Sequence, residues 1–507
     1  MESCRRAMAC WGIFCLVAIG RFDHSQAAVQ PESEAGIFGP ESQSVWQIDA
    51  RRSLFVTEQP ILARFGFRRV MDQLVRRSRV PGLTAKQLFN QWWDTQNPKP
   101  SLGLGRNCDT YTDAVGQPSI NGFPYVCRPA SERQEGQEAF NDPFVDAETN
   151  PGFYFPIALA NRFDVAPANG ANCGGYRIVY ARRSGLAFVR NRNLLIFESV
   201  LPNPNPKLGL QGCRMIVRFW ANLSTQADIE RRADLLERFY FYGIGGLPPA
   251  VDISNYGANP QGRGQVRTNQ FLEQKAFDEG RPRFWILREY KLQRQCHQDS
   301  CSKLEFVPVT VKDNSYGGLF SPASTDPRAP AFQRFFLKQI PMLAADTLAG
   351  ISMGSVPDEF NAAQSVSLNP LVDDYVAQLG SGPSAFRSAI EAKLVALGST
   401  LTADNVVARA MALSCAGCHQ LSANMDVGGG LVWPASTPSA EPNTPQGFVH
   451  TTERFTETVD GVKRFLISPA LTDVFLPARK QIMEEFLGNR QQIYRNPDDP
   501  IGGRRVH

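Results

Sequence analysis

YRIVYA (176–181) and NLLIFESV (193–200) are the two stretches that decide the fold of the central part of the chain. Both are rich in β-branched and aromatic residues and are bounded by Gly, Asn and Arg, so each predicts a strand. The same composition recurs in CRMIVRFWA (213–221), RFWILREYKL (283–292) and LEFVPVTV (304–311). One predicted helix, 227–243, interrupts these strands. The pattern indicates an α+β domain built on a mixed sheet or a sandwich.

Helical spacing of apolar residues marks the segments on both sides of this domain. Residues 58–94 carry it before the strands, with Thr84 as the N-cap of a second helix. After the breaker-rich stretch SPASTDPRAP (321–330) the spacing returns. The helices predicted there span 331–350, 384–397 and 403–418, and Thr402 is the candidate N-cap of the last.

Composition restricts the class of protein. The chain has 507 residues, and 43% of them are hydrophobic, which is enough for the cores of several domains. The 53 basic and 49 acidic residues give a net charge of +4. A balance so close to neutral argues against nucleic acid or an anionic membrane as the main partner.

The N-terminal residues predict export. The apolar run AMACWGIFCLVAIG (7–20) follows Arg5 and Arg6 and is too short to span a bilayer. A small-x-small site at 25–27 suits cleavage, so we expect a signal peptide over 1–27, a linker over 28–50 and no membrane span in the mature chain. The location would be periplasmic or extracellular. The alternative is an N-terminal core helix of a cytosolic protein.

The cysteines fall into three groups. Three of the eleven lie in the expected signal peptide, two lie in the pentapeptide CAGCH (415–419), and six remain. An even number in an exported chain predicts disulfides, for which fifteen pairings are possible. Closeness in sequence favours Cys108–Cys127, Cys173–Cys213 and Cys296–Cys301.

The pentapeptide has the spacing that attachment of a c-type haem requires. Cys415 and Cys418 lie on one side of a helical turn, where each thiol can form a thioether with a haem vinyl group, and His419 then presents an imidazole to the iron. Three alternatives remain. A zinc site needs two more ligands, and only His450 is near. A thioredoxin-type redox pair needs a preceding strand, whereas an amphipathic segment precedes this motif. The third is a structural disulfide or unused thiols.

Residues 400–490 resemble a small class I c-type cytochrome domain. The pieces that carry the resemblance are NVVARAMALSCAGCH (405–419), GGGLVWP (428–434) and PARKQIMEEFLG (477–488). It implies a helical domain holding one covalent haem c, in which a helix runs into the motif, a glycine loop returns under the proximal side and a C-terminal helix crosses the first. The whole chain, through phrases such as GLTAKQLFNQWWDTQN (82–97), also resembles large exported bacterial proteins ending in the same haem-type segment. That second resemblance adds no chemistry.

The sixth iron ligand is open between several residues. In the cytochrome family a Met on a downstream loop usually supplies it, but Met425 follows His419 too closely and Met483 lies in the terminal helix. His450 follows a Pro/Ser/Thr-rich loop long enough to reach the opposite face of the haem, so it is favoured over a vacant or water-bound position and over both methionines. The expected lining of the haem pocket is Trp433, Phe448, Phe465 and Leu466.

These inferences together predict an α+β domain over 51–325, a helical connecting region over 326–399, a haem domain over 400–490 and a tail over 491–507. The favoured function is single-electron transfer with an external partner, which is a redox protein or a small-molecule donor or acceptor. An electron carrier is favoured over an enzyme. The alternatives are a haem enzyme of peroxidase or oxygenase type and a cell-surface binding module with a haem appendage. Glu198, inside an apolar strand, is expected to be a structural carboxylate paired with an arginine.

Overall fold

The computed structural model describes residues 34–39, 46–99, 102, 104–127, 142–187, 192–257, 264–271, 285–298, 300–367, 372–436, 450–488 and 500–501. The predicted signal peptide (1–27), much of the predicted linker and nearly all of the predicted tail lie outside these residues.

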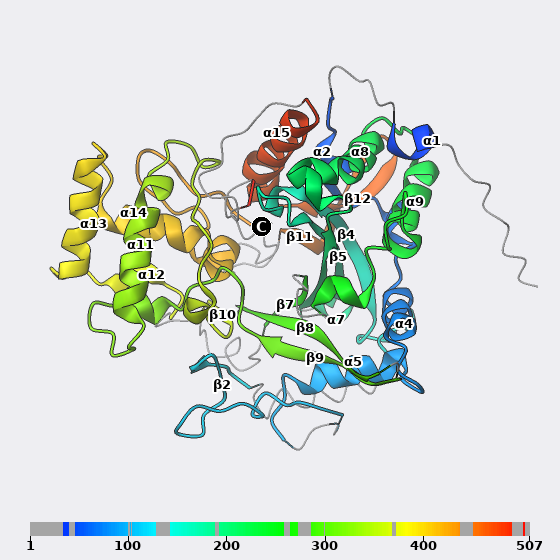
Figure 1. Cartoon of the computed structure of the whole chain (residues 1–507), viewed down its shortest axis with the longest axis horizontal. Helices are drawn as coiled ribbons and strands as arrows, with labels where there is room; N and C mark the ends of the chain where they lie inside the picture. Colours follow the sequence, from blue (N-terminus) through cyan, green and yellow to red (C-terminus); the bar gives the residue numbers. More distant parts are fainter. Residues whose placement is uncertain are drawn as a thin grey trace, which may run out of the picture.

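The centre of the molecule is a large antiparallel sheet. Within the described residues, eight strands join in the order β1-β4-β5-β6-β7-β8-β10, and β9 pairs with β8 (Figure 1). The α+β class is therefore confirmed. The strands of this sheet are β1 (Phe55–Val56), β4 (Tyr154–Arg162), β5 (Asn172–Arg182), β6 (Asn193–Pro202), β7 (Gln265–Phe271), β8 (Trp285–His297), β9 (Ser300–Val309) and β10 (Ser365–Val366).

One predicted strand is a helix. CRMIVRFWA (213–221) falls in α8 (Arg214–Leu223), whose apolar residues gather on one buried helical face. Val217 and Trp220 of this face are both buried. β-branched and aromatic composition alone favoured a strand, but the apolar residues repeat at the period of a helix, and packing on that face decides the outcome.

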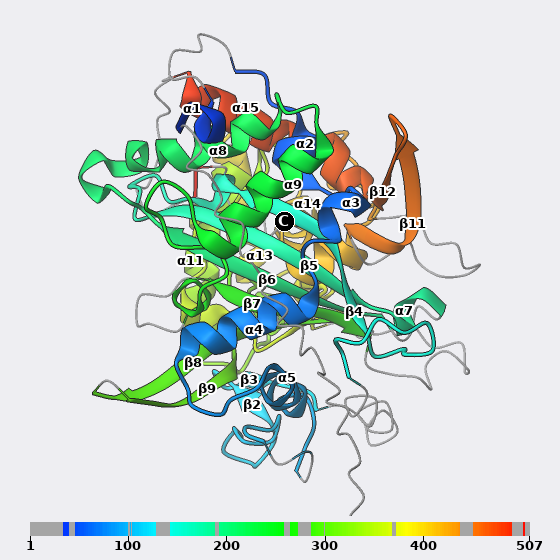
Figure 2. The same cartoon turned by 90° about the vertical axis from the view of Figure 1, so that its right-hand side faces the viewer.

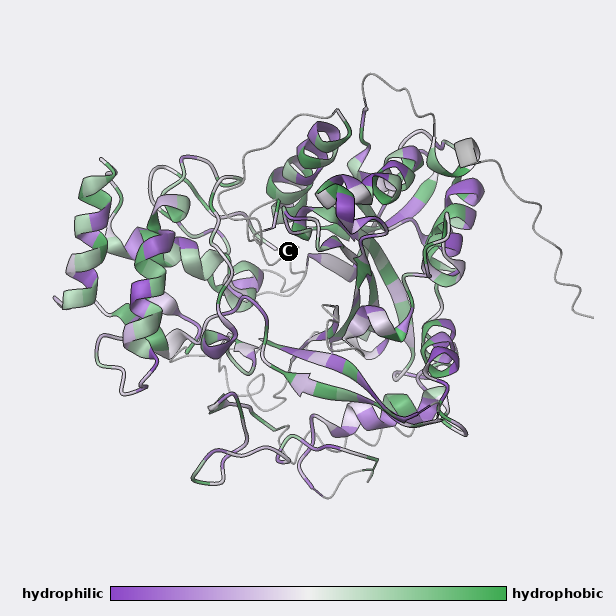
Figure 3. Ribbon diagram, in the orientation of Figure 1, coloured by the Kyte–Doolittle hydropathy of each residue, from purple (hydrophilic) through white to green (hydrophobic). Residues whose placement is uncertain are grey.

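Most of the remaining helices lie where the sequence pattern predicted them, although the helices predicted over 331–350 and 403–418 end at Leu343 and Ala412 and α12 was not predicted. Thr84 and Thr402 both form capping boxes, as their positions predicted. Figure 3 shows hydrophobic and hydrophilic residues alternating along these helices. The main ones are α4 (Phe67–Ser78), α5 (Ala85–Asp94), α9 (Ile229–Glu237), α11 (Ala329–Leu343), α12 (Tyr375–Leu379), α13 (Ala385–Ala396), α14 (Ala403–Ala412) and α15 (Leu476–Leu487). In the described part of the chain no helix is both long and apolar enough to cross a membrane.

The first face of the sheet is aromatic and is covered by helices from the first half of the chain. Tyr180 and Phe197 of neighbouring strands contact Phe67 of α4, with ring centroids 5.1 and 6.3 Å apart. Tyr176 stacks on Trp220 of α8 at 5.6 Å. Alternate residues of these strands therefore build the main core on this side.

The second face carries charged residues in its middle, which is unusual for a covered sheet. Arg177 of β5 lies directly across from Glu198 of β6, and Arg267 of β7 lies across from Glu289 of β8. Helices α11 to α14 and the loops that join them lie on this side (Figure 1). The charged middle of the sheet therefore faces the segment that contains CAGCH.

The C-terminal residues return to the first half of the chain. Residues expected to be part of a helical domain form a hairpin, β11 (Thr451–Val459) and β12 (Val462–Ile467), which lies beside α3 (Gln59–Leu62) (Figure 2). The N–H of Phe465 donates to the carbonyl of Thr57 at 3.1 Å. Helix α15 packs against α8, and Phe486 contacts Phe163 with centroids 4.8 Å apart. One continuous core thus crosses the boundaries predicted at 325 and 400.

All three disulfides favoured by closeness in sequence are present. Cys108–Cys127 and Cys173–Cys213 tie loops to the main body, while Cys296–Cys301 closes the tip of the β8–β9 hairpin. Cys415 and Cys418 are free and buried.

Candidate functional site

The helix that precedes CAGCH positions the motif. Helix α14 begins after Thr402, whose side chain accepts from the N–H of Asn405, and ends at Ala412. The chain then turns tightly, so that a side chain at position 417 would place its Cβ only 1.7 Å from the carbonyl oxygen of Met411. Only glycine fits at so short a distance, which explains why Gly417 directly precedes Cys418.

The motif lies against the second face of the sheet. Cys415 and Ala416 form a small apolar cluster with Trp285 and Leu287 of β8 and with Val311. Two side chains, one from the loop after β9 and one from β10, hold its backbone: Oδ1 of Asn314 accepts from the N–H of Cys415 at 2.9 Å, and Oγ of Ser365 accepts from the N–H of Ala416 at 3.0 Å. The motif is therefore fixed to the sheet at both its side chains and its main chain.

Both thiols of the motif are held in the neutral state. Burial raises the pKa of Cys415 to about 12, and it raises the pKa of Cys418 further, although the indole of Trp433 opposes the second shift. A thiol that serves in dithiol–disulfide exchange needs a lowered pKa and access to solvent. These thiols have neither, which argues against the thioredoxin-type alternative.

His419 is held by an aromatic ring of the sheet. Its imidazole stacks on the indole of Trp285 with centroids 4.6 Å apart and planes 22° apart. The indole N–H of Trp285 in turn donates to Oδ1 of Asn269 on β7. Residues of two strands, far away in sequence, therefore set the orientation of the histidine that follows the cysteines.

His450 lies beside His419. Its ring centroid is 4.7 Å from that of His419, and its Nε2 is 3.4 Å from Sγ of Cys418. Its Nδ1 is 2.7 Å from Oγ of Ser468, which fixes the ring. Burial and the neighbouring His419 hold the pKa of His450 well below its ordinary value, so the ring is neutral at physiological pH.

The other predicted site residues have mixed outcomes. Trp433 is fully buried beside this cluster and meets Phe475 edge-on at 6.1 Å. Sδ of Met483 accepts from Nδ2 of Asn161 at 3.4 Å, so its sulfur is occupied by the first domain. Met425 is half-buried in the glycine loop. Phe465 is buried and Leu466 half-buried in β12, whereas Phe448 lies outside the described residues.

Arg409 joins the three segments that surround the motif, and sequence reasoning missed it. Its guanidinium is buried and donates to the carbonyls of Val427 and Gly428 at 2.9 Å. It also donates to the carbonyls of Leu343 and Ala345, both at 2.8 Å. The GGG loop, α11 and α14 are thus held together by one side chain.

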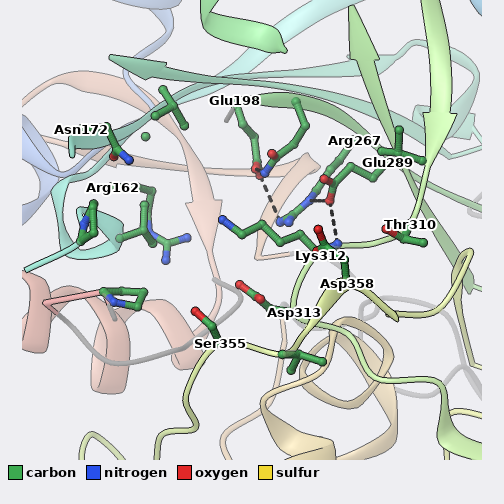
Figure 4. Close-up of a pocket in the computed structure, with 18 of the residues that line it drawn as sticks. Arg162, Asn172, Glu198, Arg267, Glu289, Thr310, Lys312, Asp313, Ser355 and Asp358 are labelled. Atoms are coloured by element: carbon green, nitrogen blue, oxygen red, sulfur yellow. Dashed lines mark hydrogen bonds and ion pairs between the residues drawn. The ribbon is translucent and has the colours of Figure 1, made fainter. Parts of the chain in front are cut away.

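Two adjoining cavities lie between the motif and the sheet. The smaller, of about 60 Å³, is bounded by His419, His450 and strands β4 to β8. The larger, of about 880 Å³, extends along the same face (Figure 4). The residues that border both are Arg162, Arg177, Glu198 and Arg267.

Glu198 is a structural carboxylate, as predicted, and belongs to this shared wall. It pairs with Arg177 at 2.9 Å and with Arg267 at 3.4 Å, and it accepts from Nε2 of Gln265 at 2.5 Å. These contacts keep its pKa below the ordinary value although burial acts in the opposite direction. Figure 4 shows Arg267 placed between Glu198 and Glu289.

The chemistry of these residues fits a covalently attached haem. Two neutral thiols that take no part in the disulfides lie beside two imidazoles, and apolar rings border them. Arginines on the adjoining wall can pair with carboxylates such as those of a haem. The two imidazole rings are too close to admit a porphyrin between them, however, so ligation by both histidines requires the His450 segment to move away from His419.

A site built from protein ligands for a bare metal ion is a separate question. Among the residues that the structure describes, no group of three or more His, Cys, Asp and Glu side chains is arranged to hold a metal ion. Sγ of Cys418 contacts the imidazole of His450, and the two imidazoles contact each other.

Comparison of the chain with protein-family models, with curated proteins and with solved structures gives no match in any of the three.

Proposed function

We propose that this protein is an exported c-type cytochrome with one haem that transfers single electrons. Cys415 and Cys418 would hold the haem through thioethers, and His419 would bind the iron. The observation that carries the proposal is the pair of free thiols beside two imidazoles, in a chain whose six other described cysteines are joined in disulfides.

The haem, when bound, supplies a one-electron couple. Thioether formation would add each thiol across a vinyl group: the S–H bond and the π bond of the vinyl group break, one S–C bond and one C–H bond form, and no net oxidation occurs. A helical turn that presents thiols at i and i+3 suits the reaction. The buried, neutral state of the thiols means that they remain unreacted with one another and with solvent oxidants.

The residues around the imidazoles orient them and exclude water. Trp285 stacks on the plane of His419, and Ser468 contacts Nδ1 of His450, so that Nε2 of His450 is the nitrogen that faces the motif, 3.4 Å from Sγ of Cys418. His450 is our candidate for the sixth ligand. Ligation by two imidazoles gives a lower potential than ligation by histidine and methionine.

The proposal also includes export and an external redox partner. Three disulfides are typical of an oxidising compartment, so we place the protein in the periplasm or outside the cell. One haem cannot pass electrons along the chain by itself. An external redox protein or a small-molecule donor and acceptor is therefore required.

The test is the absorption spectrum of the purified, exported protein, together with its intact mass. We expect a covalent haem that is retained on acid extraction and one haem mass per chain. The double variant Cys415→Ser/Cys418→Ser should lose the haem, whereas the matched variant Cys296→Ser/Cys301→Ser should keep it. Wild-type protein with the mass of the bare polypeptide would end the proposal.

A haem enzyme of peroxidase or oxygenase type is the second candidate. It is favoured by the buried Arg177, Glu198 and Arg267, which border the cavity of His419 and His450 and resemble the polar groups such enzymes need beside the iron. Peroxide-dependent oxidation of a dye at a rate well above that of free haem would favour this candidate. A reversible one-electron couple without such activity favours the electron carrier.

A further inference from the structure

The larger cavity is a site of its own beside the motif. It measures about 880 Å³, within the range of small-molecule pockets. Strands β5 to β8 form one wall, and the segments 309–313 and 353–358 form the opposite wall. The proposed haem attachment uses neither of those segments.

The buried part of the wall carries more positive than negative charge among the described residues. Three buried or nearly buried arginines line the cavity with two buried carboxylates: Arg177 and Arg267 lie beside Glu198, and Arg267 also pairs with Glu289. The third, Arg162, pairs with Asp164, which lies outside the lining and also contacts a further arginine, Arg479. The N···O distances in these five ion pairs are 2.9 to 3.5 Å.

The remaining charged groups of the lining do not reverse this excess. Lys291 and Lys312 add two positive charges, and Asp313 and Asp358 add two negative charges; in each pair one residue is half-buried and the other exposed. Burial, and then the neighbouring Arg162 and Arg267, lower the pKa of Arg177 against the pull of Glu198. An excess charge away from water is unfavourable unless an anion accompanies it.

The uncharged part of the lining mixes polar side chains, such as Asn172, Gln265 and Thr310, with apolar ones. Six apolar residues face the charged wall or flank it: Val165, Val200, Val309, Met353, Val356 and Leu413. A ligand that matches both parts has an anionic head for the arginines and a hydrocarbon body for these side chains. A planar carboxylate suits the guanidinium geometry, since two parallel N–H groups can donate to its two oxygens.

We propose that this cavity binds a small organic carboxylate, with its head on the Arg177–Arg267 wall and its apolar body against Val309, Met353 and Val356. The bound molecule would lie next to the His419–His450 cavity, because both cavities share these arginines. The proposal goes beyond electron transfer and does not depend on haem attachment.

The test is calorimetric titration of the full-length, disulfide-bonded protein with straight-chain carboxylates from acetate to octanoate and with the matching primary amides. We expect affinity to rise by about fourfold per methylene group until the apolar part is filled. Each amide should bind at least about tenfold more weakly than its acid, because it lacks the charge that the arginines require.

Substitutions locate the binding to this cavity. Lys312→Gln, at an exposed position of the lining, should weaken octanoate binding severalfold without affecting folding. Arg177→Gln should weaken it by about tenfold or more, with Arg177→Lys as the milder variant if the first does not fold. Lys463→Gln, exposed in the β11–β12 hairpin, is the matched control and should leave binding unchanged.

The outcomes separate this proposal from the proposed function. Carboxylate binding by a protein that carries no haem would support the cavity and overturn the cytochrome. A protein with a full complement of haem that binds no carboxylate, but whose midpoint potential shifts in Arg177→Gln, would assign the arginines to the carboxylates of the haem and overturn the cavity proposal. Equal affinity for acids and amides would also overturn it.

Discussion

The imidazole of His450 lies with its centroid 4.7 Å from that of His419, although a glycine loop and a Pro/Ser/Thr-rich stretch separate the two residues in sequence. The contact joins the end of the motif helix to the start of the β11–β12 hairpin. The second histidine that we propose as an iron ligand therefore lies beside the first.

Replacement of His450 tests its role at the iron. We expect His450→Ala to keep the covalent haem but to lose the low-spin absorption bands, because one imidazole is removed while both thiols remain. His297→Ala, exposed at the tip of the β8–β9 hairpin, is the matched control. An unchanged haem spectrum in His450→Ala would remove this residue from the ligand set.

Asp373 should make stability depend on pH. Its buried carboxyl accepts from the N–H of Val366, and burial raises its pKa from the ordinary value to about 7. The folded protein therefore keeps a proton that the unfolded chain releases between about pH 4 and pH 7. The stabilisation is complete below about pH 4 and is lost as the pH rises through about 7.

Asp373→Asn should remove this dependence. We expect the free energy of unfolding of wild type to fall by about 2 kcal/mol more than that of the variant between pH 5 and pH 8, measured by urea unfolding. Glu391→Gln, exposed on α13, should retain the wild-type slope. Parallel profiles for wild type and Asp373→Asn would contradict the prediction.

Arg409 should be a strong determinant of stability. Arg409→Lys keeps the charge but cannot reach four carbonyls, so buried acceptors lose their donors. We expect a loss of about 3 kcal/mol in chemical unfolding. Arg334→Lys, exposed on α11, should change stability by less than about 0.5 kcal/mol. Similar losses in the two variants would show that the four hydrogen bonds contribute little.

The disulfides should differ in their contribution to stability. Cys173–Cys213 closes a separation of 40 residues and Cys296–Cys301 one of 5. Loop-closure entropy then predicts losses of about 4 and about 2 kcal/mol when each pair is replaced by alanine. Thermal unfolding of the two double variants measures the difference. A larger loss at the hairpin tip than at the long loop would rule out this entropic account.

Local signals in the sequence predicted the elements that depend on local interactions. The N-caps Thr84 and Thr402 and the strand pairs around 176–200 were predicted, because capping and alternating burial act over a few residues. Strand β4 was missed because Pro156 and alanines dilute its strand character. The β11–β12 hairpin was missed because its strands are largely polar, since only one of their two sides packs against the rest of the protein.

The site itself was predicted only where a motif marks it. The pentapeptide identifies Cys415, Cys418 and His419, and chain length after the motif pointed to His450. Trp285 and the arginines that line the cavity were missed. Each lies in a strand, and the histidines across the cavity from it are more than a hundred positions away in the sequence. No local pattern reports which face of a sheet a distant helix will cover.

The burial of both thiols sets an order of events during biogenesis. Cys415 and Cys418 have no surface exposed to solvent, and the sheet covers one side of them. If haem is attached as proposed, the enzyme that attaches it must reach these sulfurs before α14 and the turn after it dock onto β8. The β11–β12 hairpin and α15, which follow the motif in the sequence, would then pack against the rest of the molecule after that reaction.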